Sequence, residues 1–359
     1  MKKKFIAISI TILSILTLTA CSSKEPSVAS TDAKTTEAPA SKAQEEVAID
    51  TNNLTEIVIG FPSAGADWAG GEVAIANLEG YFDEYVNPLG YKVTLTGFTG
   101  AGPAVNDALA SKDIDLAYYA ELPGIVSKSN GVDTTLLLVT TRHGSSEIVV
   151  SEDSDIKTLK DLKGKKIGYS RGTTIQEYLF KALASVGLTE GDVELVNLTA
   201  AESSSALLTG AIDANASVLV VTQALVTKNN AQVIASSNDN EEYAASTVLI
   251  GRTKFVQENE AATVAVIKAL IKAKEKIVSD PEAFYEISAE KSGVSIETII
   301  ATSGDDDVSF PSIANSLDQK YLDYLSSSKQ FLLDYELITK DFSIEDWADS
   351  TYLEKAIED

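Results

Sequence analysis

The sequence has very little of the side-chain chemistry on which most enzymes depend. Among 359 residues there is one cysteine, Cys21, and one histidine, His143. A single cysteine cannot form a disulfide within the chain, and these two residues cannot supply a zinc site or a catalytic triad. The sequence also has no Walker motif and no regular repeat. We therefore expect a protein that is not an enzyme and has no metal or cofactor, although paired carboxylates leave an enzymatic alternative open.

Positive charge is also scarce. The chain has 29 Lys and Arg residues against 53 Asp and Glu residues, a net charge of -24. A field of this sign repels phosphate backbones and anionic lipid surfaces. Nucleic acid is therefore not an expected partner, and any contact with a membrane should not depend on a basic face. With 44% hydrophobic residues, the chain can still bury a large core.

The N-terminus has the pattern of a cleavable targeting segment. Lys2, Lys3 and Lys4 precede an apolar stretch, residues 5–16, which is shorter than the roughly 20 residues that span a bilayer. Leu18-Thr19-Ala20-Cys21 then resembles the lipobox of bacterial lipoproteins. This resemblance implies a signal peptide at residues 1–20, an acylated Cys21 (palmitate included), and a position on the extracytoplasmic side of the cell membrane. The alternative is an ordinary signal peptide followed by a chance cysteine, which suits an oxidising compartment badly.

The segment that follows, residues 21–53, is rich in Ser, Thr, Ala, Lys, Glu and Pro and has no aromatic residue. It cannot bury enough apolar surface to offset the chain entropy lost on folding. We therefore expect a flexible linker between the lipid anchor and a folded part that begins near Leu54.

The folded part alternates predicted strands and helices, which is typical of a mostly parallel, doubly wound sheet. Strands are predicted at residues 57–61, 92–95, 114–119, 135–140, 148–150, 166–169, 194–198, 218–221, 232–234 and 246–250. Helices are predicted at residues 73–82, from Pro103, at 124–129, from Thr158, at 173–186, from Thr199, at 260–278, from Asp280 and at 321–335. Capping-box spacing marks two of these starts, Thr173 to Gln176 and Thr199 to Glu202.

The order of these elements predicts two α/β lobes. Lobe I is assigned residues 54–146 and 245–359, and lobe II residues 147–244. Strand 246–250 is expected to return to the first sheet. The chain would then cross between the lobes twice, near residues 145–150 and 244–250, and two crossing strands can act as a hinge.

Three segments resemble one family. They are Gly100-Ala101-Gly102-Pro103-Ala104 with residues 109–116, residues 153–167, and residues 196–214. They are similar to the aliphatic sulfonate, taurine and nitrate branch of the substrate-binding proteins that serve ABC importers. The resemblance implies a type 2 periplasmic-binding-protein fold. It also implies a monomer that captures a small anion between two closing lobes and delivers it to permease and ATPase subunits.

Open α/β sheets bind ligands at the carboxyl ends of their strands, where helix N-termini present N–H groups to anions. Four loops qualify, at residues 62–68, 99–103, 119–122 and 172–174, although glycine-rich loops also occur as plain turns. The residues expected to contact the ligand are Ser63, Trp68, Thr99, Gly100, Ala101, Tyr119, Glu121, Arg142, Gly172, Thr173, Thr174 and Val218.

Several of these residues also have structural interpretations. Glu121 is favoured as a cap of the following helix over a ligand contact, and Arg142 could pair with one of the many acids. His143 is more typical of a structural hydrogen-bonding group, and Trp68 could cover the edge of the core. Asp305-Asp306-Asp307 lacks the spacing of a calcium loop and favours a solvated loop.

The chain departs from the family at one place. Val218-Leu219-Val220-Val221 stands where family members often have Trp-Asp-Pro-Tyr. The missing carboxylate disfavours an amino-sulfonate such as taurine and favours an apolar tail or a different ligand, such as a thiamine-type pyrimidine precursor. An enzyme of the pyrimidine-synthesis branch and a surface adhesin are the other function classes, and both lack sequence support.

Overall fold

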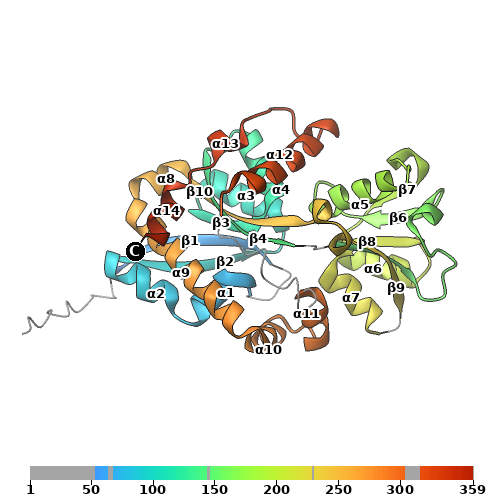
Figure 1. The fold of residues 1–359 in the computed structure, drawn as a ribbon, viewed down its shortest axis with the longest axis horizontal. Coiled ribbons are helices and arrows are strands. Elements are labelled where there is room, and N and C mark those ends of the chain that lie inside the picture. The colour runs from blue at the N-terminus through green and yellow to red at the C-terminus, as the bar shows by residue number, and fades with distance from the viewer. Residues whose placement is uncertain (1–52, 64–67, 144–145, 229, 304–315, 359) are drawn as a thin grey trace, which may run out of the picture. The chain divides into compact units, whose positions relative to one another are not determined.

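Two five-stranded sheets form the framework of the protein, as a computed structural model shows (Figure 1). The structure describes residues 53–63, 68–143, 146–228, 230–303 and 316–358. The predicted signal peptide, Cys21, the linker up to residue 52 and Asp305–Asp307 lie outside these residues. None of the helices in the described ranges combines the length and apolar character that crossing a membrane requires.

The first sheet has four parallel strands and one antiparallel strand, β10, which lies between β3 and β4. Its order is β2 (Tyr91–Phe98), β1 (Thr55–Pro62), β3 (Leu116–Ala120), β10 (Ala245–Arg252), β4 (Thr134–His143). The predicted return of the chain to the first sheet is therefore confirmed.

The second sheet repeats this plan with β5 as its antiparallel strand. Its order is β7 (Glu194–Asn197), β6 (Lys166–Tyr169), β8 (Ala214–Val218), β5 (Ser146–Ser151), β9 (Ala231–Ser236). The predicted mostly parallel α/β architecture is confirmed. The predicted strand at residues 218–221 is wrong, because β8 ends at Val218 and a helix begins at Leu219.

Helices cover both faces of the first sheet because its strands alternate buried side chains in both directions. On β3, Leu116 and Tyr118 belong to one apolar cluster, and Ala117 and Tyr119 to the other. The first face is covered by α1 (Gly71–Leu78), α2 (Tyr81–Val86), α9 (Glu260–Ser279) and α14 (Thr351–Ile357). The other face is covered by α3 (Ala101–Ser111), α4 (Glu121–Ser129), α12 (Gln319–Asp334) and α13 (Ile344–Trp347).

Three further helices pack on the second sheet, α5 (Thr174–Ser185) on one face and α6 (Ala200–Leu208) with α7 (Leu219–Val226) on the other. The remaining α-helices are α8 (Thr253–Glu258), α10 (Pro281–Ser292) and α11 (Ile296–Ser303). Short 3-10 helices are η2 (Asn87–Leu89), η3 (Leu159–Leu162), η4 (Glu190–Asp192), η5 (Ser237–Asp239) and η6 (Glu241–Tyr243).

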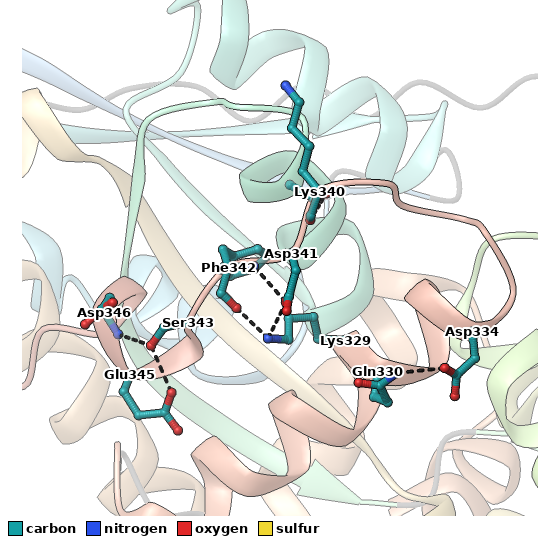
Figure 2. A network of polar contacts seen from close by, with 10 residues as sticks. Lys329, Gln330, Asp334, Lys340, Asp341, Phe342, Ser343, Glu345 and Asp346 are labelled. Atoms are coloured by element: carbon teal, nitrogen blue, oxygen red, sulfur yellow. Dashed lines mark hydrogen bonds and ion pairs between the residues drawn. The ribbon is translucent and has the colours of Figure 1, made fainter.

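Helix α12 contacts helices that pack on both sheets, α4 on the first and α5 on the second. Phe180 of α5 packs against Phe331 and Tyr335, with ring centroids 6.1 and 4.9 Å apart. One apolar cluster therefore runs from the first sheet through α12 to α5 and the second sheet. The segment after α12 is tied back by Lys329, which lies 2.7 Å from the Asp341 carboxylate and also donates to the Phe342 carbonyl (Figure 2).

A close approach of α3 and α4 depends on Gly102, where an added Cβ would stand 2.4 Å from Cγ of Pro123. Helix α3 begins two residues before Pro103, so the predicted first helical position of that proline is wrong by two residues.

We expect Gly102→Ala to lower the free energy of unfolding by about 1–3 kcal/mol in urea denaturation, as overpacking does. Gly191→Ala is the control, since its nearest neighbour, Oγ1 of Thr189, is 3.6 Å away. Equal stability of the two variants would contradict this account.

Candidate functional site

Helices α3, α4, α5 and α7 follow the carboxyl ends of the parallel strands β2, β3, β6 and β8 and have no side chain to cap them. The N-cap residues of α3, α4, α5 and α7 are Gly100, Ala120, Thr173 and Val218, and none makes a side-chain cap hydrogen bond. The first-turn N–H groups of a helix have no partner within the helix and favour an anion. By contrast, Thr199 and Glu202 cap α6 with the predicted capping box, which is confirmed. The starts of α3, α4 and α5 coincide with predicted ligand loops, whereas α7 begins beside Val218, a predicted ligand residue in a run that was predicted to be a strand.

At the start of α5 the predicted capping box between Thr173 and Gln176 is wrong. Thr173 instead donates its hydroxyl to the Ser170 carbonyl at 2.7 Å, and Gln176 accepts from the Gly172 amide at 2.7 Å. These bonds shape the turn before the helix, where Gly172 has φ 74. The Thr174 hydroxyl makes no hydrogen bond to a described residue, and the side chain is half-buried in the first turn of α5.

The start of α7 is apolar. Val218, Val220 and Val221 are half-buried around an N-terminus with no polar cap. Behind them, Thr222 and Gln223 donate to the buried carboxylate of Glu147 at 2.6 and 2.8 Å. Burial raises the pKa of Glu147, and these two hydrogen bonds oppose the shift. The polar groups of α7 are therefore used internally, and its first turn offers backbone N–H groups beside aliphatic side chains.

In the first sheet, the predicted residues after β1 and β2 lie next to each other. The Ser63 amide donates to the Phe98 carbonyl at 3.0 Å, which joins the ends of the two strands. Thr99, Gly100 and Ala101 are exposed. Trp68 is half-buried and packs against the apolar cluster under α1.

Tyr119 has a structural partner. Its hydroxyl donates to Oδ1 of Asn106 at 2.9 Å, and Nδ2 of Asn106 donates to the Pro123 carbonyl at 2.8 Å. The ring is buried, and burial raises the pKa of the hydroxyl. Tyr119 therefore fixes α3 against α4 at the end of β3.

Glu121 and Arg142 are brought together by Ser246, the second residue of β10. The Ser246 amide donates to Oε2 of Glu121 at 2.8 Å, and the Arg142 guanidinium donates to the Ser246 hydroxyl at 3.1 Å. Arg142 also stacks on Tyr324 of α12, 3.6 Å from the ring centroid. Ala120, and not Glu121, is the N-cap residue of α4. The Glu121 carboxylate accepts from the Ser246 amide of the neighbouring strand and also from its own backbone N–H in the first turn of α4, so the predicted capping role is only part of what it does. The side chain of His143 lies outside the described residues.

A second carboxylate reaches this network from the second sheet. Glu177, in the first turn of α5, accepts from the Ser328 hydroxyl of α12 at 3.0 Å and pairs with Lys181 at 2.7 Å. Burial raises the pKa of Glu121 to about 8, the charge of Glu177 adds to this shift, and Arg142 opposes it. The protonation of Glu121 is thus set by its burial, by Arg142 and Ser246 of the first sheet, and by Glu177 of α5.

Sequence reasoning missed a further buried cluster formed by Glu72, Tyr118 and Lys274. One signal was present: Lys274 follows Leu270 by four residues and precedes Ile277 by three, so it lies on the apolar face of α9. Nothing in the sequence marks Glu72 or Tyr118 as its partners. Among the described ranges, no group of three or more His, Cys, Asp or Glu residues is arranged to hold a metal ion.

Two mixed sheets with two chain crossings and helix starts at the strand ends define the type 2 periplasmic-binding-protein fold. A family described as NMT1/THI5 like matches residues 72–284, and the chain belongs to this family. A candidate aliphatic sulfonates-binding protein of Bacillus subtilis (strain 168) is 26% identical over 319 residues, which cover 86% of this chain and 90% of that protein.

Two solved structures are similar in fold. The alkanesulfonate-binding protein SsuA of Xanthomonas axonopodis pv. citri, bound to MOPS, has a TM-score of 0.69 at 19% identity, covering 83% of this chain and 99% of that one. The desulfurization enzyme DSZB has a TM-score of 0.70 at 19% identity, covering 85% of this chain and 99% of that one. The relatives named here thus include solute-binding proteins, while the fold also supports an enzyme.

The raised pKa of Glu121 predicts a pH dependence of stability. The folded state binds the Glu121 proton more tightly than the unfolded state does. Glu121 therefore adds its full contribution to the free energy of unfolding below pH 4.5, and this contribution is lost as pH rises through about 8. Between pH 5.5 and pH 8.5 we expect the free energy of unfolding of the wild type to fall by about 3 kcal/mol more than that of Glu121→Gln. Glutamine keeps an oxygen atom that can accept from the Ser246 amide. Urea denaturation of both proteins at each pH measures this difference. Parallel pH profiles would contradict a buried, proton-binding Glu121.

Proposed function

We propose that this protein is an extracytoplasmic solute-binding lipoprotein of an ABC importer. It captures a small anion of the sulfonate type and delivers it to permease and ATPase subunits. The observation that carries the proposal is the set of uncapped helix N-termini at the strand ends, α3 and α4 on the first sheet and α5 and α7 on the second. Membership of the NMT1/THI5 like family supports the same conclusion.

Neutral backbone donors suit an anion in a chain with a net charge of -24. A sulfonate has three oxygens that accept hydrogen bonds and stays ionised at all physiological pH values. Amide and hydroxyl donors, among them Thr174, can bind it without a buried cation, whose desolvation would have to be compensated. The other predicted ligand residues are assigned to direct contact with the anion. Glu121, Arg142 and Tyr119 support the site through their internal partners.

Binding would close two lobes on the ligand. The lobes are residues 54–146 with 245–359, and residues 147–244, each built around one sheet. The chain passes between the sheets after β4 and before β10, and a closed form with higher affinity for the ligand would signal loading to the permease. Such capture needs no bond-making step, which agrees with the single cysteine and single histidine.

The tail of the ligand should be apolar. The half-buried valines at the start of α7 provide no group to pair with a ligand amine, which disfavours taurine. The alkanesulfonate-binding relative described above was solved with MOPS, an organic sulfonate whose ring also carries an amine, so it supports the sulfonate group and not the apolar tail. Nitrate and a thiamine-type pyrimidine precursor are the alternatives, and both lack an alkyl tail attached to a sulfonate.

Calorimetry with ethanesulfonate, pentanesulfonate, taurine, nitrate and a hydroxymethylpyrimidine tests this ligand class. We expect affinity to rise with chain length, by up to about 0.8 kcal/mol or fourfold for each buried methylene. Thr174→Val should weaken binding about tenfold or more through loss of a hydrogen bond to a charged group. The exposed Thr227 gives the control Thr227→Val, with no expected effect. Binding of nitrate or the pyrimidine alone would contradict the sulfonate assignment.

Membrane attachment should depend on Cys21. In cells, the wild type should partition into the detergent phase of Triton X-114 and label with a palmitate analogue. We expect Cys21→Ala to lose both properties and to appear in the aqueous phase. Cys21 is the single cysteine of the chain, so labelling has no second site to confuse it. Detergent partitioning that survives the substitution would contradict the lipoprotein assignment.

A further inference from the structure

A buried ion pair connects α9 to α1. Lys274 and Glu72 are 5% and 2% exposed, and Nζ of Lys274 lies 2.9 Å from Oε1 of Glu72. The other carboxylate oxygen of Glu72 accepts from the Tyr118 hydroxyl at 2.6 Å. Lys274 also donates to the Thr140 carbonyl at 2.6 Å. Two side chains on helices thus bind strands β3 and β4 as well as each other.

Stability alone explains this arrangement poorly. Burying two charges costs desolvation free energy, and well-packed apolar residues of similar size often replace such pairs without loss. Burial lowers the pKa of Lys274 to about 8, while Glu72 opposes the shift. Lys274 also occupies a position on the apolar face of α9 where leucine or methionine would fit the pattern. The ion pair therefore has a role beyond packing, and the segments that it holds in place indicate that role.

On the strand side, the pair holds an irregularity in β4. Thr247 of β10 is in register with Thr141, and Val248 with Val139, so Thr140 is an extra residue in the ladder. Its carbonyl accepts from Lys274. Strand β4 ends three residues later, where the chain passes toward the second sheet.

On the helix side, the pair holds the first turn of α1. Glu72 is the second residue of that helix and lies four residues after Trp68. Gly71 has φ 55, and an added Cβ there would stand 2.4 Å from the Tyr118 hydroxyl. The backbone is therefore pressed onto Tyr118, which itself binds Glu72. Trp68 precedes the helix by three residues and packs against the same apolar cluster as Tyr118.

We propose that Lys274 and Glu72 are positioning residues for ligand binding. They keep Trp68 and the first turn of α1 in a fixed position against the bulge of β4. Trp68, a predicted ligand contact, and strand β4, which leads to the second sheet, then move together as one rigid unit. This inference rests on the proposed function, since it assigns the pair a role in binding of the sulfonate.

The test uses the full-length mature protein and the double variant Glu72→Gln with Lys274→Met, which leaves no unpaired buried charge. Lys272→Met is the matched control, because Lys272 lies on the same helix and makes an exposed pair with Glu84 at 2.8 Å. Tyr118→Phe is a second variant that keeps the ion pair and removes one hydrogen bond to Glu72. It serves if the double variant folds poorly.

Two measurements are made on each protein. Amide hydrogen exchange without ligand reports on residues 68–75 and 138–142, and calorimetry gives the Kd for pentanesulfonate. In the double variant we expect amide exchange at least tenfold faster in both segments and a Kd at least tenfold higher. Its melting temperature should stay close to that of the wild type. Tyr118→Phe should show a smaller change of the same kind, and Lys272→Met none.

Unchanged exchange, or faster exchange with an unchanged Kd, would overturn the positioning role. A wild type that binds none of the sulfonates would instead refute the proposed function. The exchange measurement still decides whether the pair couples α1 to β4 in that case, since it needs no ligand.

Discussion

The fold depends on one strand that runs against its neighbours. β10 brings the chain back from the second sheet and forms antiparallel ladders with β3 on one side and β4 on the other. Its apolar residues Val248, Leu249 and Ile250 are fully buried and alternate between the two faces of the sheet. Without this strand β4 would have no partner within the first sheet, and Glu121 and Arg142 would lose the serine that joins them.

Two groups of buried ionisable side chains lie near this strand, on opposite faces of the first sheet. Glu121, Arg142 and Glu177 are linked through Ser246 and α12 on one face. Glu72 and Lys274 lie among the residues of the other face, around the end of β3 and the bulge of β4. Buried charge is costly, so its concentration where the chain passes between sheets indicates a functional constraint on this region. The anion site proposed above uses backbone donors, and side-chain charges support it from behind.

The sequence predicted the architecture well because periodicity and caps are local signals. The capping box of Thr199 and the return of strand 246–250 could both be read directly from the residues. The run of residues 218–221 was assigned wrongly, since an aliphatic β-branched run fits a buried strand and the start of a buried helix equally well. The site was harder to predict. The residue types of a loop do not show whether its backbone N–H groups bind a ligand. The partners of Lys274 could not be predicted because they are distant in sequence.

The contact between α5 and α12 has a consequence for thermal denaturation. Phe180, Phe331 and Tyr335 belong to an apolar cluster that includes residues of both sheets. Neither sheet can lose its packing on this side without exposing aromatic surface of the other, which raises the free energy of any half-melted species. Scanning calorimetry of the folded part should therefore give a single endotherm, with van't Hoff and calorimetric enthalpies that agree.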